Sequence, residues 1–309
     1  MDQINGTGES FQLVALELIR KVCRTSPFLK AQYIKSIHNL ANTGSNAVAF
    51  EAANTLISLS SAPVAIRAAI SAYTRLLNAE SDSNVMLTIL NRLSSLKNRY
   101  EKILQEMIMD ILRTLTNPNI DIRRKTLELA LYLISPRNVE EVVQLLKKEL
   151  IKTESPEQGK SDEYRKLLVN ALHRCAVKFP EVVAAVTQVL LNYIGDDNNE
   201  FSLSVTNYIR EIVEEYPQVR EDVVLKLSST FDDIRASDVY RVALWVLGEY
   251  ATEAKVLGCA LDAIRNSVGE LPLLAPKVEE KVEEKKDVPE IKAVPAKVAP
   301  KNTVLADGK

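Results

Sequence analysis

The segment of residues 100–131, YEKILQEMIMDILRTLTNPNIDIRRKTLELAL, contains two amphipathic patterns separated by Asn117-Pro118. In the first pattern the apolar residues recur at intervals that place them on one helix face: Ile103, Leu104, Met107, Ile108, Ile111, Leu112 and Leu115. Charged residues fall on or near the opposite face. Because proline disfavours helical geometry at the residue before it, the segment predicts one helix over 100–116, a stop at Asn117 and a second helix directly afterwards.

Prolines that can start helices recur at a near-constant distance along the chain. Proline suits the first turn of a helix, where its missing N–H is not needed. The candidates are spaced by 36, 73, 44 and 37 residues: Pro27, Pro63, Pro136, Pro180 and Pro217. The interval of 73 holds two units, with the missing start near Tyr100, and the interval of 44 includes an extra polar loop over 152–160. The unit is therefore about 37 residues long.

A second series of helix starts lies between these prolines. Its members are spaced by 37, 37, 43, 38 and 36 residues: Val48, Val85, Ile122, Arg165, Leu203 and Val239. Two interleaved series with one period predict two helices per repeat, which is typical of a HEAT or armadillo-type solenoid. A bundle of unrelated helices is the alternative, but a bundle has no reason to repeat its breaks at a fixed distance.

The pattern predicts an all-α solenoid of about seven helix pairs over residues 9–270, with a disordered N-terminus at 1–8. Residues 271–309 are rich in proline and charge, so they bury too little apolar surface to offset the entropy of ordering, and we expect a disordered linker there. The first helix, FQLVALELIRKVC (11–23), lacks the polar outer face of a terminal repeat. We therefore expect it to pack against an upstream repeat of a longer chain.

Composition excludes several classes of protein. Only 9 of 309 residues are glycine, whereas nucleotide-binding α/β enzymes and β-sandwiches use many glycines in phosphate loops and turns. The net charge of −2 provides no global cationic field, so we expect no nucleic-acid partner. We find neither a signal peptide nor an apolar run long enough for a membrane span, and expect a soluble cytosolic protein.

No arrangement of side chains indicates catalysis, and we predict no catalytic, cofactor-binding or metal site. His38 and His173 each lie late in a predicted helix, where a helix dipole can account for them. The paired acids Asp196-Asp197, Glu214-Glu215 and Asp232-Asp233 lie at predicted helix ends or in loops. Solvation and helix capping explain such carboxylates without general acid–base chemistry.

The remaining distinctive residues are interpreted as structural. Cys23, Cys175 and Cys259 are far apart and are expected to be reduced core thiols. Trp245 is expected to lie in the core between repeats. The run Arg123–Lys125 could form part of a basic ridge, but we favour an ion pair between one of these residues and an acid of the neighbouring repeat.

Beyond the repeat pattern, five blocks resemble the helical trunk of the coatomer beta subunits of the COPI vesicle coat. The blocks include TNPNIDIRRKTLELALYLISPRNVEEVVQLLKKEL and VYRVALWVLGEY, and they follow one another in the same order as in that family. They span 51–77, 80–97, 109–153, 164–184 and 239–250, within a resemblance that covers about 11–275.

The resemblance implies a non-catalytic scaffold in retrograde Golgi-to-ER and intra-Golgi transport. It implies delta, gamma and zeta coat subunits as partners and peripheral attachment to the cytosolic face of the Golgi membrane through the coat. An ARF-family GTPase recruits coatomer in this family, but the family's GTPase-binding surface lies mainly on early repeats that this sequence does not show. No motif fixes which residues contact a partner, so no partner-binding residue is assigned.

Two other classes remain open from the residues alone. One is a different cytosolic HEAT-repeat scaffold, such as a transport receptor or a phosphatase scaffold. The other is a solenoid that binds nucleic acid or membrane, which the nearly balanced charge disfavours.

Overall fold

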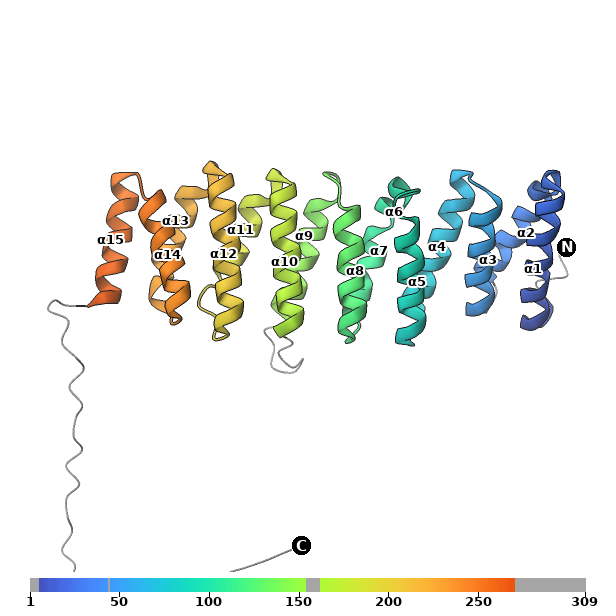
Figure 1. The fold of residues 1–309 in the computed structure, drawn as a ribbon, viewed down its shortest axis with the longest axis horizontal. Coiled ribbons are helices and arrows are strands. Elements are labelled where there is room, and N and C mark those ends of the chain that lie inside the picture. The colour runs from blue at the N-terminus through green and yellow to red at the C-terminus, as the bar shows by residue number, and fades with distance from the viewer. Residues whose placement is uncertain (1–5, 44, 154–161, 270–309) are drawn as a thin grey trace, which may run out of the picture. The chain divides into compact units, whose positions relative to one another are not determined.

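The computed structural model describes residues 6–43, 45–153 and 162–269. The described chain is helical, with two layers of α-helices and short 3-10 turns (Figure 1). The predicted linker at 271–309 lies outside the described residues, as do the first five residues and most of the predicted loop at 152–160. Within the described residues, no helix combines the length and the apolar character needed to cross a bilayer.

The helices alternate strictly between a first and a second layer. The first layer contains α1 (Glu9–Thr25), α3 (Asn46–Leu59), α5 (Ser83–Leu96), α8 (Ile120–Leu133), α10 (Asp162–Lys178), α12 (Asn199–Glu215) and α14 (Ser237–Tyr250). The second contains α2 (Lys30–Thr43), α4 (Pro63–Ala79), α6 (Glu101–Glu106), α7 (Ile108–Leu112), α9 (Val139–Lys152), α11 (Val183–Leu191), α13 (Arg220–Ser229) and α15 (Ala254–Val268). With α6 and α7 taken together, these are seven pairs, which confirms the predicted solenoid.

Both predicted series of helix starts correspond to real boundaries. Pro63 begins α4, and three other prolines begin the 3-10 turns η2 (Pro27–Leu29), η5 (Pro180–Val182) and η6 (Pro217–Val219), each of which leads into a second-layer helix. Pro136 differs, because it lies in a turn ahead of α9. There the Asn138 side chain accepts a hydrogen bond of 2.8 Å from the Ser135 N–H and closes the turn.

The prediction of one continuous helix over 100–116 is wrong. The chain leaves helical geometry at Met107 (φ −101°, ψ 7°), which separates α6 from α7, and it ends in a 3-10 turn, η3 (Arg113–Thr116). Contacts with α4 flank the break: Arg67 pairs with Glu106 at 2.8 Å, and the Asn78 amide donates to the Asp110 carbonyl at 3.2 Å. Tertiary contacts with α4 thus lie on both sides of the break.

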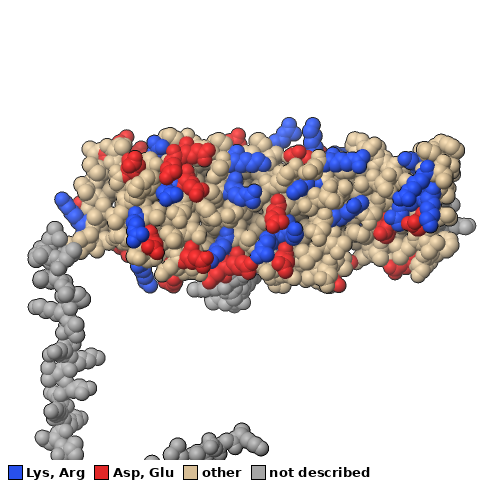
Figure 2. All heavy atoms as spheres, viewed as in Figure 1, with Lys and Arg blue, Asp and Glu red and all other residues tan. Residues whose placement is uncertain are grey.

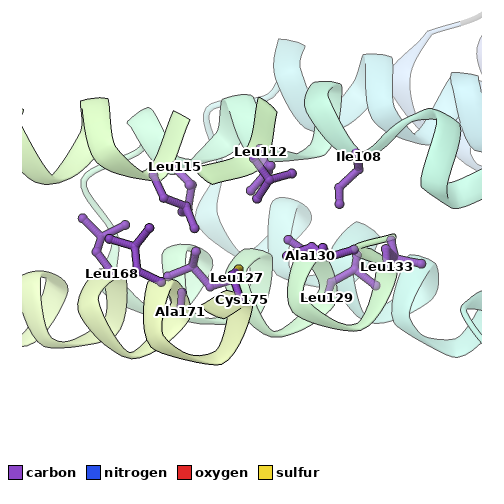
Figure 3. Close-up of a cluster of buried hydrophobic side chains, with 14 of the residues drawn as sticks. Ile108, Leu112, Leu115, Leu127, Leu129, Ala130, Leu133, Leu168, Ala171 and Cys175 are labelled. Atoms are coloured by element: carbon purple, nitrogen blue, oxygen red, sulfur yellow. The ribbon is translucent and has the colours of Figure 1, made fainter. Parts of the chain in front are cut away.

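The core is a continuous apolar layer between the two rows of helices. In the middle of the array, Ile108, Leu112 and Leu115 from the second layer face Leu127 and Leu133 of α8 (Figure 3). Leu168, Ala171 and Cys175 of α10 extend the same cluster into the next repeat (Figure 3). Each repeat therefore buries apolar surface against its neighbours, as expected for a solenoid.

The face of α1 that points away from α2 and α3 is apolar. Leu16, Ile19 and Cys23 are buried against the neighbouring helices, whereas Phe11, Val14 and Leu18 are each more than half exposed. Spacings of three and four residues put these three exposed side chains on one stripe of the helix.

Candidate functional site

The sequence predicted no catalytic group, and the histidine with a buried environment has a structural role. His173 on α10 stacks on the Tyr208 ring of α12, with ring centroids 4.3 Å apart and planes at 15°. Its Nε2 lies 3.1 Å from Oε2 of Glu211, also on α12. Burial lowers the pKa of His173 below its usual 6.5, and Glu211 opposes that shift only in part. His173 thus links α10 to α12.

The other histidine has no such environment. Nδ1 of His38 lies 3.4 Å from the amide nitrogen of Asn42, one turn further along α2, on the exposed surface. Across the described part of the chain, no cluster of three or more His, Cys, Asp or Glu side chains could hold a metal ion.

The three thiols differ in exposure, and the prediction that all of them lie in the core is wrong for one. Cys23 and Cys175 are buried as expected, and burial raises the pKa of the Cys175 thiol to about 12. Cys259, in contrast, is exposed on α15. The residues of α15 that reach the core are Val256, Ala260 and Ala263, and position 259 lies at the margin of the face that they form.

The expectation that Trp245 belongs to the core is also wrong. Its side chain is 43% exposed, because α14 uses Val239, Ala243, Val246 and Leu247 to contact the core. The indole packs edge-on against Tyr250 at 5.9 Å and lies 5.9 Å from the Arg210 guanidinium of α12. Trp245 therefore covers the junction between α12 and α14 from outside.

The structural interpretation of Arg123–Lys125 is confirmed. Arg124 on α8 pairs with Glu163 on α10, the equivalent helix of the next repeat. Arg123 lies over the Tyr164 ring at 3.9 Å and donates to the Leu115 carbonyl at 3.1 Å.

Similar polar contacts connect successive repeats along the array. They join residues 31 to 39 positions apart, close to one repeat: Arg20 with Glu51 at 3.1 Å, Arg67 with Glu106 at 2.8 Å, Lys166 with Glu200 at 2.7 Å, Arg235 with Asp197 at 3.5 Å, and Arg165 with Asp196. In the last pair Arg165 is only 5% exposed and lies over the Phe201 ring at 4.4 Å. Asp196 is thus not the solvated loop acid that the sequence suggested.

The candidate contact surface for partners is the second-layer face between α7 and α13. One groove of about 600 Å³ runs between α11 and α13 and is bordered by Lys147 of α9. A second, of about 570 Å³, lies between α7, α9 and α11, with Met109 and Val143 in its wall. The second-layer helices α11 and α13, which line the first groove, are short, with 9 and 10 residues, whereas α10 and α12 of the first layer have 17.

Sequence reasoning did not find these grooves. Their lining residues are ordinary members of amphipathic helices, among them Ala184, Gln188 and Lys226, and no motif distinguishes them.

Comparison with known proteins agrees with this architecture. Residues 1–281 match the family described as the adaptin N terminal region. The chain is 46% identical to coatomer subunit beta-2 of Arabidopsis thaliana over 310 residues, which cover 100% of this chain and 32% of that protein. It is 42% identical to coatomer subunit beta of Sus scrofa over 298 residues, which cover 96% and 31%. The chain therefore spans about a third of the length of the curated relatives it matches.

Among solved structures, the fold is similar to a chain in a homology model of the full-length AP-3 complex in an intermediate open conformation. The TM-score is 0.49 at 17% identity, over 83% of this chain and 53% of that one. The family match covers the two-layer helical array, including the prolines at the starts of its helices. The chain belongs to the adaptin N-terminal region family.

Proposed function

We propose that this protein is a non-catalytic structural subunit of the COPI vesicle coat. The observation that carries the proposal is the identity of 42–46% to coatomer beta subunits of a plant, an amoeba and a mammal, over at least nine-tenths of the chain in each case. The two-layer solenoid supports it, since such an array presents long surfaces to several partners at once.

In this role the chain acts in retrograde Golgi-to-ER and intra-Golgi transport. It resides in the cytoplasm and, as part of the coat, on the cytosolic face of Golgi membranes and vesicles. Its partners are delta, gamma and zeta coat subunits. Recruitment of the complete coat involves an ARF-family GTPase, whose contact we place outside this segment.

We further propose that the second-layer grooves receive a globular partner subunit of the delta type. Their combination of exposed polar residues such as Gln188 and Lys226 with apolar walls is the composition of a non-obligate protein interface. Specific interfaces bury about 800 Å² on each partner, which requires a surface extending over several helices.

Affinity purification of the tagged chain from cytosol tests this function. Recovery of delta-, gamma- and zeta-type subunits is expected, whereas recovery of nucleoporins or a phosphatase catalytic subunit in their place would identify another helical-repeat scaffold. The groove is tested by Ala184→Arg combined with Gln188→Glu, two exposed positions of α11. The control is Asn91→Arg on the exposed face of α5 in the first layer, which should leave recovery unchanged.

A further inference from the structure

One edge of the array carries a row of basic side chains in three consecutive repeats. We call it the basic edge; it consists of Lys97, Arg99, Lys102, Arg137, Arg174 and Lys178. These residues lie where α5 leads into α6, where α8 leads into α9 and at the end of α10. Figure 2 shows basic side chains gathered along the upper edge above α5, α8 and α10, and acidic side chains above α12.

The basic edge differs from the opposite edge in how its charges are satisfied. At the opposite edge, Arg124, Lys166 and Arg235 each pair with a carboxylate of an adjacent repeat. Among the residues that the structure describes, the six cations of the basic edge have no carboxylate partner within 4.0 Å. Three of them make other contacts: Lys97 lies over the Tyr132 ring at 4.6 Å, Arg99 lies over the Tyr100 ring at 5.3 Å, and Lys178 donates to the Ile134 carbonyl at 3.3 Å.

A pocket of about 670 Å³ opens in the middle of this row. Lys97, Arg174 and Lys178 stand at its wall, and Leu131, Tyr132 and Phe179 supply apolar surface. Tyr132 is 40% exposed, so part of its aromatic ring is accessible beside the cations. The pocket therefore combines positive charge with room for one large apolar side chain.

Two glutamates also line the pocket and restrict what can bind. Glu128 forms an ion pair with Lys125 at 3.6 Å, and Glu101 accepts a hydrogen bond of 3.1 Å from the Gln105 amide. A flat anionic membrane would meet these carboxylates together with the cations. A peptide can instead alternate its side chains so that its acids face the cations and an apolar residue enters the pocket.

We propose that the basic edge is a docking site for an acidic segment of a partner protein, bound in extended form across three repeats. Neighbouring helices lie about 8–10 Å apart and an extended chain advances about 3.3 Å per residue, so one repeat corresponds to about three residues of peptide. The segment has carboxylates about three residues apart, to match successive repeats, and one aromatic or large aliphatic side chain for the pocket.

Fluorescence anisotropy on the purified chain tests the proposal with a labelled peptide of about nine residues that has Glu at every third position and one central Trp. A peptide with Gln in place of each Glu should bind about tenfold more weakly or worse. The double variant Arg137→Glu, Arg174→Glu should weaken binding of the acidic peptide by about tenfold or more. Both residues are exposed, so the thermal unfolding midpoint should change little.

The matched control is Lys147→Glu combined with Lys226→Glu, which makes the same change of charge on the second-layer groove. Because solvent ions screen exposed charges beyond about 8 Å at physiological salt, this variant should change the affinity by less than about twofold. Equal losses in both double variants would show a non-specific effect of net charge and overturn the proposal.

The pocket is tested separately by Tyr132→Ala. This variant should weaken binding of the Trp-containing peptide but not binding of a peptide with Ala at the central position, because only the former uses the pocket.

Sedimentation with phosphatidylserine vesicles tests whether the basic edge binds an anionic membrane instead. Vesicle binding that is lost in the Arg137→Glu, Arg174→Glu variant, without peptide binding, would make the edge a membrane surface and the proposal wrong. Peptide binding is measured on the chain alone, so its outcome is independent of co-purification with coat subunits.

Discussion

The buried Arg165 on α10 forms an ion pair with the part-buried Asp196, which precedes α12 in the next repeat. The guanidinium also lies over the Phe201 ring, and Asp196 accepts a 3.0 Å hydrogen bond from the Asn198 N–H. This pair joins two successive repeats. A largely buried pair of this kind adds specificity of geometry more than net stability.

Breaking that pair should be costly because the part-buried Asp196 carboxylate would lose this cation and Phe201 would lose the guanidinium that packs on it. Arg165→Ala is expected to lower the free energy of unfolding by about 3 kcal/mol, measured by urea unfolding monitored by circular dichroism. Arg124→Ala removes an ion pair whose two side chains are much more exposed and should cost at most about 1 kcal/mol. Similar losses in the two variants would show that the burial of Arg165 is energetically unimportant.

The environment of His173 predicts a specific dependence of stability on pH. Its pKa is lowered in the folded state, so the unfolded chain binds more protons just below pH 6.5. The neutral imidazole therefore contributes its full stability at pH values above the pKa that His173 has in the unfolded chain. This contribution is lost as the pH falls through the lower pKa that His173 has in the folded chain. Between about pH 7.5 and pH 5.5, His173→Gln should lose less stability than the unmodified chain, as judged by urea midpoints.

The control for this effect is Asn170→Ala, which removes the 3.0 Å hydrogen bond from Asn170 to the Tyr208 hydroxyl. This variant leaves the imidazole and its burial in place, so it should keep the pH dependence of the unmodified chain. If His173→Gln kept the full pH dependence as well, the titration of His173 would not be its source.

The thiols should react in the order of their exposure. With iodoacetamide at neutral pH, Cys259 is expected to be alkylated in the folded chain, whereas Cys23 and Cys175 react only after unfolding. Burial both blocks access and, for Cys175, suppresses the thiolate by raising the pKa to about 12. Peptide mass spectrometry after alkylation with and without urea measures this order, and early labelling of Cys175 would contradict the packing of α10.

The layer of apolar side chains between the two rows of helices predicts large cavity costs. Leu112 is buried at the centre of that layer, so Leu112→Ala should lower the free energy of unfolding by about 2–5 kcal/mol. Leu244 on α14 is partly exposed, and Leu244→Ala should cost about 1 kcal/mol or less. Comparable costs at both sites would mean that the outer face of α14 is packed as tightly as the core.

Much of the array could be predicted from local chemistry. Prolines at first-turn positions and apolar residues at helical spacing act within one or two turns of chain, so Pro63 and Val85 mark helix starts without reference to the rest of the fold. The ion pair of Arg124 with an acid of the next repeat could be foreseen for a similar reason, because stacked repeats place equivalent helix ends side by side.

The faces of individual helices were harder to predict. In ALWVLGEY every position from Ala243 to Leu247 is apolar, so the local pattern does not reveal that Ala243 and Val246 turn inward and Trp245 outward. Cys259 was misplaced for the same reason. The break at Met107 is flanked by contacts with Arg67 and Asn78, which are about 30 to 40 residues distant in sequence.

Local patterns along the chain specify a repeating array of paired helices, because helix starts, stops and apolar faces are set by interactions over a few residues. Where the surface is hollowed and which charges remain unpaired depend on the packing of the repeats. The grooves beside α11 and α13, the ion pair of Arg165 with Asp196 and the basic edge all depend on how one repeat is placed against the next. That placement results from packing and charge pairing between residues about one repeat apart, which local patterns do not encode.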